Sequence, residues 1–219
     1  MQGGQGLSDR ALGLRLAETL ATRLCHDLSG PLSGLTAALG ETGADAGALP
    51  LAQEAATVLR LRLGLLRAAW GAPTALSADM LEEYAAGLPN AQRLRLVLAG
   101  KLRTATLPQA AGRLLLNALL LAAASLPRGG RIALEGDPAR DIVLAIEGTG
   151  AAWPAGLGRL LAEPDAAWGS LDEAGRGPRL HAALTALLAH AAGVRARLLL
   201  GATGDAAAPL LFDFAAVAR

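Results

Sequence analysis

Leucines recur at helical spacing through the N-terminal part of the chain. They are Leu12, Leu16, Leu20, Leu24, Leu28, Leu32, Leu35 and Leu39. At about 100° per residue these positions fall on one side of a helix, so the spacing predicts one long amphipathic helix over residues 8–39. Ser8 and Asp9 are suitable N-capping residues, and Pro31 is expected to bend the helix rather than end it.

A second amphipathic segment, residues 51–70, follows a turn rich in Gly and Ala at 40–50. Two antiparallel helices cannot cover all of their apolar surface by packing on each other alone. Pairing of two such hairpins into a four-helix bundle is the usual solution. We therefore predict that residues 1–72 form a helical hairpin domain and that the protein is a homodimer.

Beyond the segment GAPTALS at 71–77 the pattern changes to a mixture of helices and strands. The predicted helices cover residues 78–87, 108–126, 155–163 and 179–191, and the predicted strands cover 94–100, 131–136, 141–148, 194–200 and 209–217. This order indicates an α+β sandwich in which helices cover one face of a largely antiparallel sheet. Residues 76–219 are thus predicted to form a second domain.

Composition narrows the classes of function. The chain holds 51 Ala and 47 Leu among 219 residues, only 3% aromatic residues and a net charge of +1, which argues against a nucleic-acid-binding protein. The single Cys25 excludes an intramolecular disulfide and a cysteine-based zinc cluster, as expected in a reducing compartment. The N-terminus lacks a signal-peptide pattern and the longest apolar run, 114–126, is too short for a bilayer span. We expect a cytoplasmic protein without membrane partners.

The chemistry-bearing segment of the first predicted helix is Cys25-His26-Asp27-Leu28-Ser29-Gly30-Pro31. His26 lies about 160° from the centre of the leucine row, so its ring is predicted to face solvent. Its neighbours on that side are candidate contacts for a docking partner: Thr22, Arg23, Ser29, Gly30 and Ser33. Consecutive residues on a helix cannot converge on one metal ion, and no nucleophile elbow is present. Two interpretations of His26 remain. It is either a catalytic nucleophile whose ring is oriented by Asp27, or an ordinary surface histidine.

Two motifs carry a family resemblance. His26 to Pro31 resembles the H-[DE]-x-x-x-P phosphoacceptor motif of histidine kinases, and residues 20–27, together with 114–130, are similar to the ChpT-type histidine phosphotransferases of alphaproteobacteria. The resemblance implies a dimerisation and phosphotransfer hairpin followed by a degenerate kinase-type ATP-binding domain.

The resemblance also locates the ATP-binding motifs of a kinase and shows how they depart from the family pattern. Asn117 matches the asparagine that helps to hold Mg²⁺, but Leu120 and Ile146 stand where a basic residue and the adenine-reading aspartate are expected, with Glu147 one position away. The last glycine-rich motif begins at Gly175 and Gly177 and continues into Pro178 and Arg179. A loop cradles phosphates only with free N–H groups and close backbone approach, so ATP binding is expected to be lost.

The function implied by the resemblance is histidine phosphotransfer in a bacterial phosphorelay. His26 would accept a phosphoryl group from the phospho-aspartate of a receiver domain of a hybrid histidine kinase and pass it to receiver domains of response regulators. No intrinsic cofactor or metal is expected, because the receiver brings its own Mg²⁺. An active soluble histidine kinase and a non-catalytic adaptor dimer remain as alternatives. Gly30 replaces the Thr or Asn common in kinases with phosphatase activity, so little phosphatase activity is expected.

Overall fold

The computed structural model describes residues 3–41, 48–72, 75–173, 178–201 and 204–215. The chain divides into two compact units, residues 1–63 and 64–219. The predicted linker at 71–77 follows the second helix, whereas the units divide inside that helix. The reason is that Leu65, Leu66 and Ala69 near its end are buried residues of the second unit.

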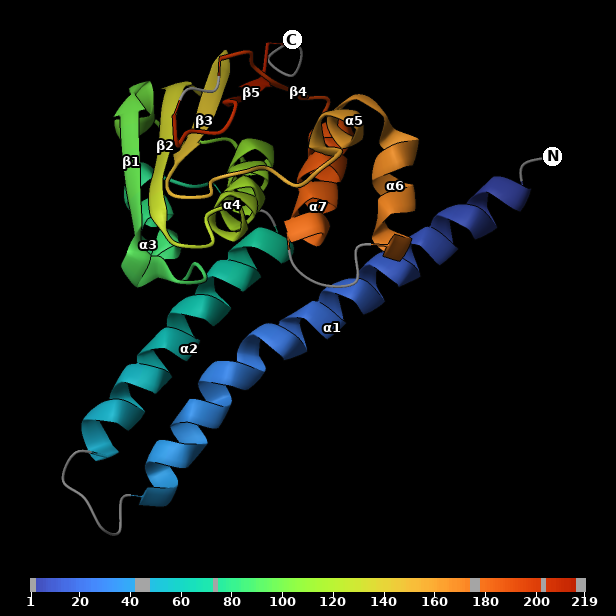
Figure 1. Cartoon of the computed structure of the whole chain (residues 1–219). Coiled ribbons are helices and arrows are strands. Elements are labelled where there is room, and N and C mark those ends of the chain that lie inside the picture. The colour runs from blue at the N-terminus through green and yellow to red at the C-terminus, as the bar shows by residue number, and fades with distance from the viewer. Residues whose placement is uncertain (1–2, 42–47, 73–74, 174–177, 202–203, 216–219) are drawn as a thin grey trace. The chain divides into compact units, whose positions relative to one another are not determined.

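The first unit is a helical hairpin, as predicted. Helix α1 spans Gly3–Glu41 and continues through Pro31, and helix α2 spans Ala48–Trp70. The two helices lie side by side, with α1 blue and the start of α2 blue-green in Figure 1. Small residues such as Ala38, Ala48 and Ala52 are buried, which lets the helices approach closely near the connection.

The second unit is built on a five-stranded sheet. The strands are β1 (Leu94–Gly100), β2 (Gly130–Asp137), β3 (Asp141–Glu147), β4 (Arg195–Leu198) and β5 (Leu210–Asp213), in the order β1-β2-β3-β5-β4. Strands β1 and β2 pair in parallel, and the other pairs are antiparallel. The helices are α3 (Ala78–Ala85), α4 (Gln109–Ala124), α5 (Leu157–Ala162), α6 (Pro164–Glu173) and α7 (Pro178–Ala191), with short 3₁₀ turns at Ala91–Arg93 and Lys101–Arg103.

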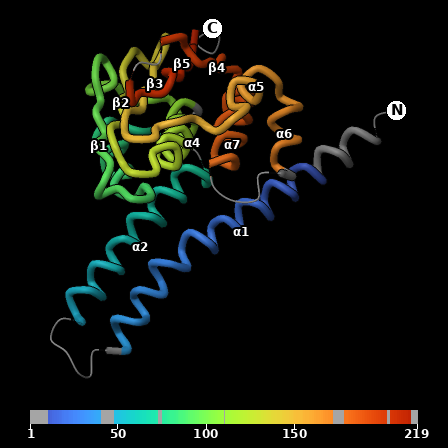
Figure 2. Tube along the Cα trace, viewed as in Figure 1, coloured from blue at the N-terminus to red at the C-terminus, as the bar shows by residue number. Residues whose placement is uncertain are grey.

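One face of this sheet forms the core. Alternate residues such as Ile132, Leu134, Ile142 and Leu144 are fully buried, whereas their neighbours along the strands are more exposed. Helices α4 and α7 pack against each other, and Figures 1 and 2 show both on the same side of the sheet. Period-two alternation with one apolar face is the pattern of a sheet covered on one side. The predicted α+β class is confirmed.

The structure differs from the sequence-based expectation at three elements. Helix α6 was not predicted, although Pro164 at its first position is a favourable helix start. Strands β4 and β5 are shorter than predicted, because strand pairing covers only residues 195–198 and 210–213 while the apolar runs continue beyond them. The predicted end of the last strand, residues 216–217, lies outside the described residues. None of the described helices is both long enough and apolar enough to cross a bilayer.

The segment between β3 and α7 packs onto the second unit. The indole nitrogen Nε1 of Trp153 donates a hydrogen bond of 2.6 Å to the carbonyl of Ala208. Leu157, Leu161 and Ala167 from α5 and α6 are buried. In its described part this segment is therefore a packed layer of the second unit.

Candidate functional site

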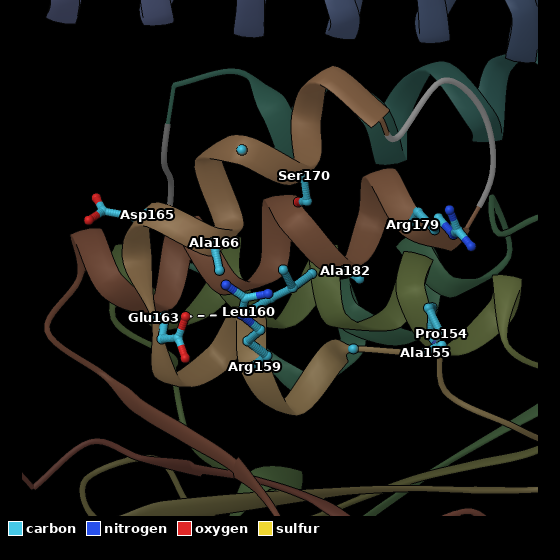
Figure 3. A pocket seen from close by; sticks show the side chains of 12 residues that line it. Pro154, Ala155, Arg159, Leu160, Glu163, Asp165, Ala166, Ser170, Arg179 and Ala182 are labelled. Carbon is cyan, nitrogen blue, oxygen red and sulfur yellow. Dashed lines mark hydrogen bonds and ion pairs between the residues drawn. The ribbon is translucent and has the colours of Figure 1, made fainter.

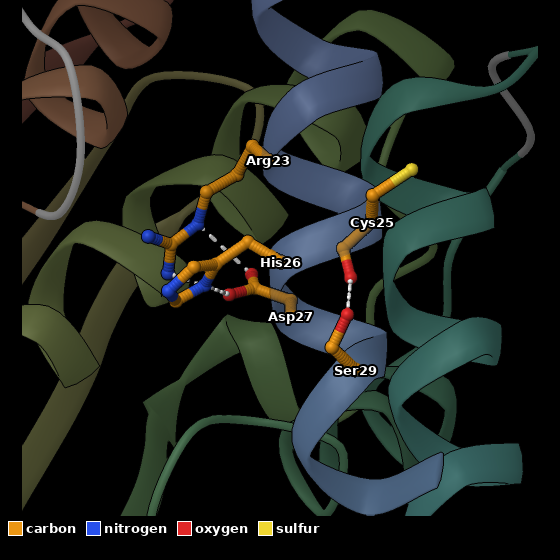
Figure 4. Close-up of polar contacts among 5 residues, drawn as sticks. All are labelled: Arg23, Cys25, His26, Asp27 and Ser29. Carbon is orange, nitrogen blue, oxygen red and sulfur yellow. Dashed lines mark hydrogen bonds and ion pairs between the residues drawn. The ribbon is translucent and has the colours of Figure 1, made fainter. Parts of the chain in front are cut away.

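His26 projects from the middle of α1 with its ring accessible. The side chain is 56% exposed, and Nδ1 lies 3.3 Å from Oδ1 of Asp27 (Figure 4). In the tautomer that donates Nδ1–H to Asp27, the lone pair is on Nε2. A neutral, exposed imidazole with an adjacent carboxylate acceptor has the features that a nucleophilic histidine needs.

Asp27 is much less exposed than the histidine next to it. Its side chain is only 7% exposed, and both carboxylate oxygens bind the guanidinium of Arg23, one turn earlier on α1. Nε of Arg23 donates to Oδ2 at 3.0 Å, and Nη2 lies 2.8 Å from Oδ1. A two-point contact of this kind holds the plane of the carboxylate. Asp27 is thus positioned by Arg23 and in turn contacts His26, as Figure 4 shows.

The predicted docking residues have different surroundings. Thr22, Ser29, Gly30 and Ser33 are exposed on α1. The hydroxyl of Ser29 donates a 2.6 Å hydrogen bond to the carbonyl of residue 25 in its own helix, and a side chain at position 30 would meet nothing within 4 Å. Arg23 is only 13% exposed because its guanidinium is held by the carboxylate. The small exposed residues leave open surface beside His26, whereas Arg23 belongs to the support of the site.

The structure adds Arg62, a residue that sequence analysis missed. Arg62 lies on α2 in the same compact unit and is partly buried. Burial lowers the pKa of Arg62 from its usual value, the negative charge of Asp27 opposes that shift, and the charge of Arg23 adds to it. A sequence pattern could have revealed Arg62. On the second helix, small or apolar residues recur at a spacing of 3–4, and Arg62 is the one charged residue of this row: Ala48, Ala52, Ala55, Leu59, Arg62.

In the second unit, the side chain of Asn117 is hydrogen-bonded within the fold. It is fully buried on α4. Its amide nitrogen donates to the carbonyls of Ala69 and Arg113, both at 2.9 Å, and its carbonyl accepts from Nε1 of Trp70 at 3.1 Å. Both amide protons and the carbonyl oxygen are therefore engaged by the fold.

The other positions that align with the ATP-binding motifs of kinases offer little to a nucleotide, because their side chains are apolar or already contact other residues. Leu120 and Ile146 are fully buried in the core, so neither offers a polar group to a nucleotide. Glu147 is exposed and lies 3.8 Å from Arg131 of the neighbouring strand. Pro178 begins α7, and Arg179 follows it at the surface. The glycines at 175 and 177 lie outside the described residues.

A cavity of about 580 Å³ between α5, α6 and α7 is lined by Arg179 but by neither Asn117 nor Ile146 (Figure 3). Its other charged lining residues do not form a phosphate site. Nε of Arg159 donates to the carboxylate of Glu163 at 3.0 Å, and Asp165 adds a second negative charge. The cavity does not bring the kinase-type positions together.

The two other histidines occupy different environments from His26. His181 is buried, with 1% of its surface exposed. His190 is partly buried on α7, and its Nε2 lies 2.9 Å from the carbonyl oxygen of Leu160. Only His26 among the three presents an exposed ring beside a carboxylate.

Comparison with known proteins identifies the family. A family profile described as the histidine phosphotransferase C-terminal domain matches residues 78–204, more than half of the chain. The chain belongs to the histidine phosphotransferase family. A solved structure described as a bacterial phosphotransferase is similar over 91% of this chain and 95% of that one, with 25% sequence identity and a TM-score of 0.66. The ChpT-type resemblance is confirmed.

Two further comparisons add little to the family assignment of this phosphotransferase. Full-length ShkA in complex with AMPPNP aligns with 90% of the chain and 45% of its own length, at 19% identity and a TM-score of 0.35, which is too low to support an argument. No curated protein sequence matches the chain. The profile match covers only the second unit, and the solved phosphotransferase extends the similarity over the hairpin that holds His26.

Proposed function

We propose that this histidine phosphotransferase is a phosphorelay intermediate in which His26 is the phosphoacceptor. The phosphoryl donor is the phospho-aspartate of a receiver domain of a hybrid histidine kinase, and the acceptors are receiver domains of response regulators. The observation that carries the proposal is the half-exposed imidazole of His26 with Nδ1 3.3 Å from the Asp27 carboxylate, in a chain of this family.

The reaction exchanges one bond to phosphorus for another. The lone pair on Nε2 of His26 attacks phosphorus, the P–Nε2 bond forms, and the P–O bond to the receiver aspartate breaks and returns that residue to a carboxylate. Nδ1–H stays on the ring and donates to Asp27, which favours the tautomer with its lone pair on Nε2. Because the transition state is loose, positioning and charge neutralisation supply most of the catalysis. The receiver supplies Mg²⁺.

ATP-dependent autophosphorylation is not part of the proposal. Asn117 is held by three hydrogen bonds within the fold, and Ile146 is buried where a kinase needs a carboxylate. A nucleotide would have to break those bonds and find a substitute for the missing acceptor. These contacts favour a relay over the kinase alternative.

The active form in this proposal is a homodimer through the hairpin. Large apolar residues remain exposed on the helices of one chain, among them Leu32, Leu39, Leu51 and Val58. An apolar groove between α1 and α2 is lined by residues that include Pro31 and Ala55. A second hairpin would cover these surfaces in a four-helix bundle. Sedimentation of the wild-type protein at micromolar concentration tests this, and a species of 22.1 kDa would contradict it.

The decisive experiment incubates the protein with receiver domains carrying ³²P on aspartate. We expect transfer of label to the protein, with the label labile in acid and stable in base as a phosphohistidine is. A second, unlabelled receiver added afterwards should remove the label. A protein that never acquires label from any receiver of its own organism would be an adaptor and not a relay.

A further inference from the structure

Helix α2 belongs to both compact units. It spans Ala48–Trp70 without a break, and its last two turns, residues 64–70, are part of the second unit. Leu65 and Ala69 in these turns are fully buried. A helix end that is buried in this way differs from an exposed one, because its free backbone groups cannot bind water and need a partner in the protein.

The carbonyl of Ala69 is one of the free groups at this end. The last four carbonyls of a helix have no partner within the helix, and that of Ala69 accepts a hydrogen bond of 2.9 Å from the side-chain nitrogen of Asn117 on α4. A buried polar group without a partner costs free energy. Asn117, which is 48 residues away in the sequence, thus acts as a C-terminal cap of α2 that the second unit supplies.

Two further hydrogen bonds hold the amide of Asn117 in this orientation. Its Oδ1 accepts from Nε1 of Trp70, the last residue of α2, at 3.1 Å. Its nitrogen also donates to the carbonyl of Arg113, one turn earlier on α4, at 2.9 Å. The end of α2 is therefore joined to α4 by two hydrogen bonds of one fully buried side chain, in surroundings of low polarity that strengthen them. We call Ala69, Trp70 and Asn117 the α2 cap.

The part of α2 that belongs to the hairpin has much less support of its own. Of residues 48–63, all of which the structure describes, only Ala48 and Ala52 are buried. Nucleation is the costly step of helix formation, whereas each further residue adds one hydrogen bond for a smaller loss of entropy. A helix that is packed and capped at residues 64–70 can therefore extend into the hairpin part at little further cost.

We propose that the second unit anchors the second helix of the hairpin and that Asn117 is the residue that secures it. The α2 cap keeps residues 64–70 helical, and the helix continues from there through residues 48–63. This role needs no nucleotide, so it assigns a function to a unit whose kinase-type positions are buried or already hydrogen-bonded. It does not depend on phosphoryl acceptance by His26.

The test compares Trp70→Phe with Trp153→Phe by hydrogen–deuterium exchange of the full-length protein under native conditions. Each variant removes one indole N–H donor from the second unit, but Trp153 donates to the carbonyl of Ala208 and not to the α2 cap. Trp70→Phe should raise amide exchange in residues 52–63 about fivefold, the effect of losing one typical hydrogen bond. Trp153→Phe should leave exchange in residues 52–63 at the wild-type rate.

Asn117→Ala removes the whole cap and should give a larger effect. We expect exchange in residues 52–63 to rise by more than tenfold, because the carbonyl of Ala69 and the indole of Trp70 both lose their partner. Trp70→Phe carries the test if Asn117→Ala does not fold.

Two results would overturn the proposal. One is an increase confined to residues 64–70 and α4, with residues 52–63 at the wild-type rate. The other is an equal increase in residues 52–63 for Trp70→Phe and Trp153→Phe, which would show only a general loss of stability in the second unit. Either result leaves the proposed phosphoacceptor in place, since labelling of His26→Ala tests that function separately.

Discussion

Each of the two compact units holds one polar residue that matches a histidine-kinase motif, His26 in the hairpin and Asn117 in the second unit. The two residues differ in their exposure and in their hydrogen bonding. In the hairpin, His26 keeps its ring more than half exposed and contacts a carboxylate that is itself held in place. In the second unit, Asn117 is fully buried and all of its hydrogen-bonding groups are engaged by the backbone and by Trp70. The ring of His26 is therefore accessible to a partner, whereas the side chain of Asn117 has no hydrogen-bonding group left for a ligand.

The contrast between the two units depends on His26 being the residue that accepts the phosphoryl group. His26→Ala should abolish labelling by a phosphorylated receiver, a loss of at least a thousandfold, because the nucleophile is removed. The fold should persist, since an exposed side chain contributes little to stability. Circular dichroism and the labelling assay check both points. His190→Ala is the control and should still be labelled.

The structural role of Asn117 makes a prediction of the opposite kind. Asn117→Ala removes three hydrogen bonds and leaves buried groups unpaired, so the free energy of unfolding should fall by roughly 2–4 kcal/mol. Trp70→Phe, which removes one donor of that set, should cost about 1 kcal/mol. Chemical denaturation measures both. An unchanged midpoint in Asn117→Ala would contradict the assignment and point back to a ligand role.

The Asp27→Asn variant tests whether Asp27 orients the ring of His26. The variant keeps the size of the side chain but loses the charge that binds Arg23 and accepts Nδ1–H. We expect phosphoryl acceptance to slow by about tenfold to a hundredfold while a receiver still docks, because orientation and not contact is lost. Single-turnover transfer kinetics and calorimetric titration with the receiver separate the two quantities. An equal loss of affinity would make Asp27 a docking residue.

The smallest expected effect concerns nucleotide binding, for which we expect no measurable heat. Titration of the wild-type protein with Mg·ATP to millimolar concentration should give no binding heat, since Ile146 and Leu120 are buried apolar residues. Ile146→Asp should not restore binding and should destabilise the second unit, because it buries an unpaired carboxyl group. Micromolar ATP binding by the wild type would remove the contrast between the two units and favour the kinase alternative.

Much of the fold followed from local patterns in the sequence. The leucine spacing predicts a helix that the structure shows as α1, and the alternation from Leu94 to Gly100 matches β1 to the residue. Helix α6 was missed because it has only ten residues and includes Gly169, a poor helix former. It packs against α7, and such tertiary packing supplies most of the stability of a short helix. The ends of β4 and β5 were overextended because pairing partners, not apolar character, decide where a strand stops.

For the candidate site, sequence alone determined the pair His26–Asp27 and the outward direction of the histidine, because both follow from neighbouring positions on one helix. It also determined that Ile146 and Leu120 have no polar group to offer. Only the tertiary structure decided that Arg23 binds Asp27 at two points and that the side chain of Asn117 is hydrogen-bonded to Ala69 and Trp70. Those relations join residues distant in sequence or select one rotamer among several, and packing is what makes that selection.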